Sequence, residues 1–242
     1  MKCLVMIPAY NEEASICKVI EKLEKDCPQA DYLVINDCSK DGTEECLLKM
    51  GAAFVSLPLN LGIGGAVQTG YQYARDHGYD IAVQIDGDGQ HDTAYLKRVI
   101  EPIEQGKADV VIGSRFLTGE GFQSSGIRRM GIRFLSTLIK LCTGEIVYDV
   151  TSGFRAVSKE MIALYADDYP YDYPEPEAIV MASMEGMRIQ EIPVIMVERQ
   201  AGTSSISPAK SIYYMMKVSI AVILCRCLRK KHKRGQESCQ KH

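Results

Sequence analysis

One polar segment organises this sequence: Asp86-Gly87-Asp88-Gly89-Gln90-His91-Asp92. It directly follows residues 80–85, an apolar run whose length and composition are typical of a buried parallel strand. Open α/β sheets bind their ligands at the carboxyl ends of such strands, which is where these carboxylates stand. Because Gly87 separates Asp86 from Asp88, both carboxylates can point into one crevice while the backbone stays close to a ligand.

The two carboxylates of this segment favour a divalent cation. Asp86 and Asp88 repel each other at one point unless a cation lies between them, and such hard oxygen ligands suit Mg²⁺ or Mn²⁺. An Asp/Gly cluster after a strand is otherwise often only a turn. An EF-hand calcium loop is excluded, because its glycine and glutamate positions hold His91 and Lys97. The segment therefore predicts either a turn or a metal-phosphate site.

Apolar strands alternate with helices along the chain. Strands are expected at residues 3–7, 32–35, 53–57, 80–85, 109–113 and 188–197. The first helix is expected to start with Asn11 as its N-cap, residues 148–155 to form a polar segment, and residues 158–166 a helix. This alternation predicts an α/β fold with a mostly parallel, Rossmann-like sheet and helices on both faces.

The glycine-rich segment at residues 60–66 has two interpretations. It resembles a dinucleotide fingerprint, but Val67 occupies the place of the third glycine, and it follows a loop rather than a strand. Close packing and anion contact at a helix N-terminus both remain open for Gly62 and its neighbours.

The C-terminal residues differ from the rest in charge. Residues 207–242 contain nine Lys and Arg against one Glu, a balance of +8, whereas the whole chain carries −3 and the remainder therefore −11. Residues 211–228 are strongly apolar, but these 18 residues fall short of the ~20 that span a bilayer. We expect a catalytic domain at residues 1–206 and, at residues 207–242, an amphipathic helix at a membrane interface. A helix packed on the domain or on a second subunit is the alternative.

The cysteines indicate the compartment. The chain has nine of them, scattered and without a CxxC pair, which is typical of reduced thiols rather than a zinc site or a disulfide framework. No signal peptide is expected, because the chain opens directly on a strand and helix pattern. These features predict a cytoplasmic protein, peripheral at the inner face of the membrane.

Taken together, these segments resemble family 2 glycosyltransferases with a GT-A fold, and among them the dolichyl/polyprenyl-phosphate sugar synthases. The resemblance spans residues 4 to about 205 and is carried by six motifs: Ile7-Pro8-Ala9-Tyr10-Asn11-Glu12, Asn36-Asp37-Cys38-Ser39-Lys40-Asp41-Gly42-Thr43, Asn60-Leu61-Gly62, Gln84-Ile85-Asp86-Gly87-Asp88-Gly89-Gln90-His91, Gly113-Ser114-Arg115 and Ser152-Gly153-Phe154-Arg155.

The resemblance implies roles for the matching residues. The residues expected to bind the donor nucleotide are Pro8, Ala9, Tyr10, Glu12, Asp37, Gly62, Asp86, Gly87, Asp88 and Arg199. The expected metal ligands are Asp86, Asp88 and Gln90. The residues expected near the acceptor phosphate are Arg115, Arg128, Arg129, Ser152 and Arg155.

The resemblance also implies a reaction, in which a sugar passes with inversion from a nucleoside-diphosphate sugar to a polyprenyl-phosphate lipid. UDP is the favoured nucleotide, with glucose or N-acetylglucosamine as the sugar. The alternative is transfer to a sugar hydroxyl in a cell-surface polysaccharide, which requires a carboxylate base such as Asp149 or Glu177. Beyond the substrates, a small membrane protein is a candidate partner, a homo-oligomer stays open, and nucleic acid is not expected.

Two other functional classes fit the sequence less well. A sugar nucleotidyltransferase would carry a glycine-rich loop with Arg and Lys after the first strand, where this chain has Pro8-Ala9-Tyr10-Asn11. A catalytically silent membrane tether would not need Asp86, Asp88 and Gln90, which are all in place.

Overall fold

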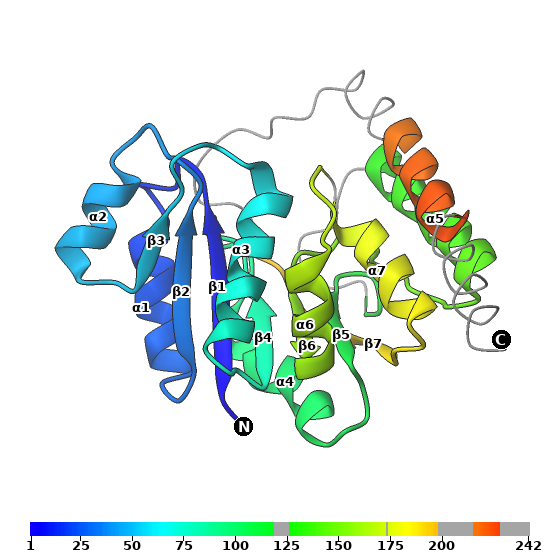
Figure 1. The fold of residues 1–242 in the computed structure, drawn as a ribbon, viewed down its shortest axis with the longest axis horizontal. Helices are drawn as coiled ribbons and strands as arrows, with labels where there is room; N and C mark the ends of the chain where they lie inside the picture. The colour runs from blue at the N-terminus through cyan, green and yellow to red at the C-terminus, as the bar shows by residue number, and fades with distance from the viewer. Residues whose placement is uncertain (119–125, 173, 198–214, 228–242) are drawn as a thin grey trace, which may run out of the picture.

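The computed structural model describes residues 1–118, 126–172, 174–197 and 215–227 (Figure 1). Arg199 and the expected domain boundary at residues 206 and 207 lie outside these ranges. The strands are β1 (Cys3–Ala9), β2 (Asp31–Asn36), β3 (Phe54–Ser56), β4 (Ile81–Gln84), β5 (Val110–Ser114), β6 (Arg155–Ser158) and β7 (Ile189–Pro193). The helices are α1 (Ile16–Asp26), α2 (Thr43–Met50), α3 (Gly62–Asp76), α4 (Leu96–Glu104), α5 (Gly126–Thr143), α6 (Lys159–Asp167) and α7 (Pro174–Met184), with a short 3₁₀ turn before α4.

The strands form one sheet in the order β3-β2-β1-β4-β6-β5-β7. Each neighbouring pair within β3-β2-β1-β4 is parallel, as is β5 with β7, whereas β6 runs antiparallel to both β4 and β5. The expected α/β class with a mostly parallel sheet is therefore confirmed. The strand β6 was not expected, because its four residues follow a polar segment and show no apolar alternation of their own.

Helices cover both faces of the sheet (Figure 1). Along β1, Leu4 and Met6 belong to one apolar core, whereas Val5 and Ile7 belong to the other. The first core contains residues of α3, α5, α6 and α7, and the second contains residues of α1 and α4. Because successive strand residues point to opposite faces, a continuous apolar run is what a strand buried on both sides requires.

The loop after β1 differs from the expectation. Helix α1 begins at Ile16 with Ser15 at its N-cap, so the prediction of Asn11 as the cap is wrong. Asn11 instead adopts a left-handed conformation with φ 56°, which Asn tolerates better than most residues. Its side-chain oxygen accepts a hydrogen bond of 2.7 Å from the backbone N–H of Lys40. Asn11 thereby links the loops that follow β1 and β2.

Residues 215–227 form a helix that lies beside α5 (Figure 1). Val218 and Val222 on this helix are fully buried and belong to the first core. Its Lys217 pairs with Asp172 at 2.5 Å. One side of the helix therefore packs on the rest of the fold, as in the alternative stated above. Within the described ranges, no helix combines the length and the hydropathy that crossing a bilayer demands.

Candidate active site

A cavity of about 1290 Å³ opens where β1, β2 and β4 end and α3 begins. Ligand pockets commonly enclose ~300–1,000 Å³, so this volume suits a ligand as large as a nucleotide with an attached sugar. The lining includes every residue expected to bind the donor nucleotide except Arg199, which lies outside the described residues: Pro8, Ala9, Tyr10, Glu12, Asp37, Gly62, Asp86, Gly87 and Asp88. The loops after three different strands therefore meet at one site.

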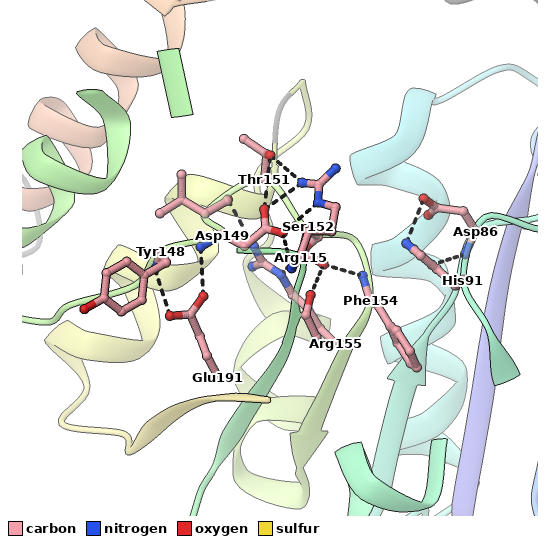
Figure 2. Close-up of polar contacts among 12 residues, drawn as sticks. Asp86, His91, Arg115, Tyr148, Asp149, Thr151, Ser152, Phe154, Arg155 and Glu191 are labelled. Atoms are coloured by element: carbon pink, nitrogen blue, oxygen red, sulfur yellow. Dashed lines mark hydrogen bonds and ion pairs between the residues drawn. The ribbon is translucent and has the colours of Figure 1, made fainter. Parts of the chain in front are cut away.

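His91 orients Asp86 within this cavity (Figure 2). The backbone N–H of Asp86 donates to Nδ1 of His91 at 3.0 Å. Since Nδ1 accepts this bond, the ring proton of neutral His91 is on Nε2, which lies 3.5 Å from Oδ2 of Asp86. The ring is buried and stacks on Phe154 with 5.2 Å between centroids. His91 was not singled out from the sequence, although its place in the acidic segment was the available signal.

Asp88 and Gln90 stand on the same loop. Asp88 is 4% exposed, and its Oδ1 accepts a hydrogen bond of 3.0 Å from the backbone N–H of Gln90. Within the described ranges, no three His, Cys, Asp or Glu side chains form a cluster that could hold a metal ion. The available donors are therefore the carboxylates of Asp86 and Asp88 and the side-chain amide of Gln90. This set fits Mg²⁺ or Mn²⁺ only if water and substrate phosphate complete the coordination, which is the usual arrangement for Mg²⁺.

Glycines leave room around the carboxylates. A Cβ at Gly153 would lie 3.0 Å from Oδ1 of Asp86, and a Cβ at Gly87 would lie 3.2 Å from the carbonyl oxygen of Pro8. Both separations are tighter than a side chain normally tolerates. The absence of side chains at these two positions thus lets the backbone after β4 lie close to β1 and to the segment before β6 without displacing its neighbours.

Asp37 holds the start of α3. Its two carboxylate oxygens accept hydrogen bonds from the backbone N–H groups of Leu61, at 2.7 Å, and Gly62, at 2.9 Å. Gly62 has a φ of 75°, in the region that favours glycine. A Cβ at Gly64 would lie only 2.2 Å from the carbonyl oxygens of Pro170 and Tyr171. Both interpretations of this glycine-rich segment thus apply: one glycine contacts an anion, which is Asp37, and another permits close packing.

Arg115 and Asp149 form a buried ion pair (Figure 2). The guanidinium donates to Asp149 through Nε at 2.7 Å and Nη2 at 2.6 Å, and Nη2 also donates to Thr151. Arg115 is 8% exposed and Asp149 fully buried. The backbone N–H groups of Tyr148 and Asp149 in turn donate to Glu191. Arg115 thereby joins the end of β5 to the segment before β6, and its expected contact with the acceptor phosphate stays a prediction.

Of the other residues expected near the acceptor phosphate, Ser152 and Arg155 lie close to Arg115 (Figure 2), whereas Arg129 lies on α5. Arg155 is 2% exposed and donates to the carbonyl oxygens of Val150, Ser152 and Glu175. The Ser152 hydroxyl donates to the carbonyl of Gly113 at 2.6 Å. Arg129 lies on the exposed side of α5, whereas the side chain of Arg128 lies outside the described part. Ser152 and Arg155 thus hold the loop before β6 in place.

The cavity contains a candidate for a general base, Glu175, that was not expected from the sequence. Asp149 is committed to Arg115, and Glu177 is not among the lining residues. Glu175, at the start of α7, does line the cavity with Asp86 and Asp88. Burial raises the pKa of Glu175 above its ordinary value, while the charge of Arg155 acts in the opposite direction. Glu175 and Glu177 are two residues apart, and only the placement of α7 decides which one reaches the site.

Comparisons with known proteins identify sequence relatives of this chain. The sequence model of the family "Glycosyl transferase family 2" matches residues 4–164. An undecaprenyl-phosphate mannosyltransferase of Micrococcus luteus is 30% identical over 219 residues, covering 86% of this chain and 88% of that protein. A UDP-N-acetylglucosamine–dolichyl-phosphate N-acetylglucosaminyltransferase of Methanococcus voltae is 28% identical, covering 91% of this chain and 97% of that one.

A solved structure shows the same fold. Glucosyl-3-phosphoglycerate synthase from Mycobacterium tuberculosis, in complex with Mn²⁺, UDP and phosphoglyceric acid, superposes with a TM-score of 0.70 at 22% identity. The match covers 93% of this chain and 78% of that one. The expected resemblance in fold is thereby confirmed.

Proposed function

This chain belongs to glycosyl transferase family 2, and from that premise we propose that it transfers a sugar from a nucleoside-diphosphate sugar to a polyprenyl phosphate. The observation that carries the proposal is the cavity in which the loops after β1 and β2 meet Asp86 and Asp88. A phosphate oxygen of the lipid attacks the anomeric carbon from the face opposite the diphosphate. The bond to the diphosphate breaks, and the products are a glycosyl-phosphate lipid and the nucleoside diphosphate.

We favour UDP as the donor nucleotide. The relative from Methanococcus voltae is named for a UDP-sugar donor, and the structure from Mycobacterium tuberculosis contains UDP. Pro8, Ala9 and Tyr10 at the end of β1 would contact the base and ribose. Tyr10 is 47% exposed, so its ring is available to a ligand. Asp37 would act both on the nucleotide and through the start of α3, which its carboxylate already holds.

We assign a Mg²⁺ or Mn²⁺ site to Asp86, Asp88 and Gln90. The related structures that contain Mn²⁺ or Mg²⁺ together with UDP support this assignment. A divalent cation at this place would neutralise the negative charge that grows on the departing diphosphate. His91 keeps Asp86 turned toward the cavity through its two contacts with that residue.

We place the reaction at the cytoplasmic face of a membrane, where a polyprenyl phosphate is found. The eight cysteines in the described part of the chain are free thiols, which supports a reducing compartment. A small membrane protein remains a candidate partner, because the described helices include none that crosses a bilayer.

A direct assay tests the lipid acceptor. The purified chain would be incubated with Mn²⁺, detergent-dispersed undecaprenyl phosphate and, in turn, labelled UDP-glucose, UDP-N-acetylglucosamine and GDP-mannose. We expect one donor to give a lipid-extractable, acid-labile product that EDTA abolishes. The unphosphorylated polyprenol serves as the matched control and is expected to give none. Transfer to oligosaccharides but not to the lipid phosphate would contradict the proposal.

Glu175 favours a second candidate function, transfer to a sugar hydroxyl, because such an acceptor needs a base that takes up its proton. A lipid phosphate is already anionic and needs little such help. We therefore expect Glu175→Gln to keep the rate of lipid glycosylation within about tenfold of wild type, whereas loss of a general base costs ~10²–10⁴-fold.

Glu177→Gln is the matched control, because it makes the same change two residues away and outside the cavity lining. The rates of both variants would be measured with saturating donor and Mn²⁺. If only Glu175→Gln lowers the transfer rate, and by the ~10²–10⁴-fold expected for loss of a general base, the result would favour a sugar hydroxyl as the acceptor.

A further inference from the structure

Helix α5 and the helix of residues 215–227 lie side by side at the end of the molecule opposite α2 (Figure 1). Each buries one side in the same apolar core. Ile132, Leu135 and Ile139 of α5 are buried in this core, as are Val218 and Val222 of the other helix. Because both helices bury these sides in a common core, their opposite sides face away from the domain.

The outward sides of the two helices are apolar as well. Their side chains recur at helical spacing and are between 52% and 80% exposed: Met130, Phe134, Leu141, Met216, Ile220 and Leu224. We call these six residues the two-helix face. The helix of residues 215–227 thus has apolar residues on two opposite sides, and the core covers only one of them. Single exposed apolar residues need no explanation, but several of them grouped on two neighbouring helices favour an interaction site.

Basic residues flank the two-helix face. On α5, Arg129, Arg133 and Lys140 are exposed, and the helix contains no Asp or Glu. Residues 215–227 also contain no acidic residue and carry Lys217, which pairs with Asp172, and Arg226. In the sequence, residues 229–234 add five more Lys and Arg, whereas residues 1–206 carry a net −11. The charged residues of the two described helices are thus all basic, on a chain whose net charge is negative.

We propose that the two-helix face docks on an anionic phospholipid membrane, with both helices lying in the plane of the interface. Apolar residues that enter the acyl boundary beside Lys and Arg that meet lipid phosphates are the pattern of interfacial helices. A second copy of this chain fits less well, because it would bring Arg133 and Lys140 against the same cations with no acidic residue on either helix. The docking is argued from the residues of the two-helix face alone. It also deepens the proposed function, and in that respect rests on it, because it states at which surface of the molecule a membrane-bound acceptor would reach the enzyme.

Vesicle sedimentation tests the docking without any sugar chemistry. The full chain would be mixed with phosphatidylcholine vesicles, with and without phosphatidylglycerol, in the absence of polyprenyl phosphate and nucleotide. We expect binding only to the anionic vesicles, weakening as NaCl is raised, since salt screens the basic residues. Phe134→Glu and Ile220→Glu should each lower the partition coefficient by on the order of tenfold or more. Arg133→Gln with Lys140→Gln should reduce the preference for anionic lipid.

Leu48→Glu on α2 is the matched control, because Leu48 is 63% exposed at the far end of the molecule. It should bind as wild type does. Phe134→Glu should keep its transfer rate on detergent-dispersed acceptor, so failure of docking and failure of the proposed reaction are distinguishable. The proposal would be overturned if the wild type did not bind vesicles, or if all three Glu variants lost binding equally. It would also be overturned if Phe134→Glu converted a dimer to a monomer while vesicle binding stayed intact. Binding only to native membranes, abolished by protease treatment of those membranes, would overturn it in favour of a membrane protein.

Discussion

Asp88→Ala is expected to lower the rate of sugar transfer by about 10²–10³-fold or more, the range found when one group that stabilises developing charge is removed. Asp88 lines the cavity and is more buried than Asp86, the other carboxylate of this loop in the lining. Without it, the proposed cation site keeps only Asp86 and Gln90. The fold should persist, because the change removes a hydrogen bond with the N–H of Gln90, whose net contribution is about 1 kcal/mol.

Two measurements separate the metal site from a general loss of structure. The first is the transfer rate at saturating donor and Mn²⁺. The second is the rise in thermal midpoint that the UDP-sugar causes with Mn²⁺ relative to EDTA, since a ligand of the native state stabilises it by mass action. We expect Asp88→Ala to lose both while its midpoint without ligand stays close to wild type.

Asp92→Ala is the matched control for this variant. Asp92 belongs to the same acidic segment but pairs with Lys22 at 2.7 Å and is not among the lining residues of the cavity. Its loss should leave both the rate and the Mn²⁺-dependent shift intact. Near-normal transfer by Asp88→Ala would refute the metal assignment, and an equal loss in both variants would point to disruption of the loop instead.

Asp149→Ala is expected to lower the free energy of unfolding by about 3–5 kcal/mol, because it leaves the Arg115 guanidinium buried without its counter-ion. That is a large part of the ~5–15 kcal/mol that stabilises a typical domain. Both carboxylate oxygens receive guanidinium hydrogen bonds, and Arg115 is 8% exposed, so water cannot replace the lost partner. Urea unfolding followed by circular dichroism measures the change.

Two comparisons sharpen this prediction. Asp76→Ala removes a carboxylate that pairs with Arg75 at the surface and should leave the unfolding midpoint near that of wild type. The double variant Arg115→Met with Asp149→Leu should regain part of the loss, because it removes the unpaired charge as well as its partner. A decrease below about 1 kcal/mol for Asp149→Ala would mean that the pair is not structural, and Arg115 would return as a candidate for acceptor phosphate.

Much of the fold and of the nucleotide side of the cavity could be predicted from sequence, because both depend on local patterns. A short, mostly apolar run such as residues 81–85, bounded by polar residues and glycine, predicts a strand buried on both faces, and the residues after such a strand stand at the carboxyl end of the sheet. The same reasoning placed Tyr10, Asp37 and Asp86 on neighbouring strand ends, and the structure brings them to one cavity. Their roles in binding stay predictions.

Other features depended on contacts between distant parts of the chain. The four residues of β6 form a strand because β4 and β5 offer their edges to it, not because of a pattern of their own. Asp149 pairs with Arg115 across 34 positions of sequence, a contact that no local pattern predicts; their expected roles toward the acceptor stay predictions.

The sequence by itself therefore determined which residues stand at the ends of the parallel strands, since side-chain periodicity and strand boundaries follow from short-range patterns. Only the tertiary structure decided that Glu175 rather than Glu177 reaches the cavity, and that the helix of residues 215–227 buries one apolar side while presenting another. The physical reason is that the direction of a side chain relative to a distant surface depends on how whole elements pack. Packing is a property of all the contacting residues together, and no single segment of sequence contains it.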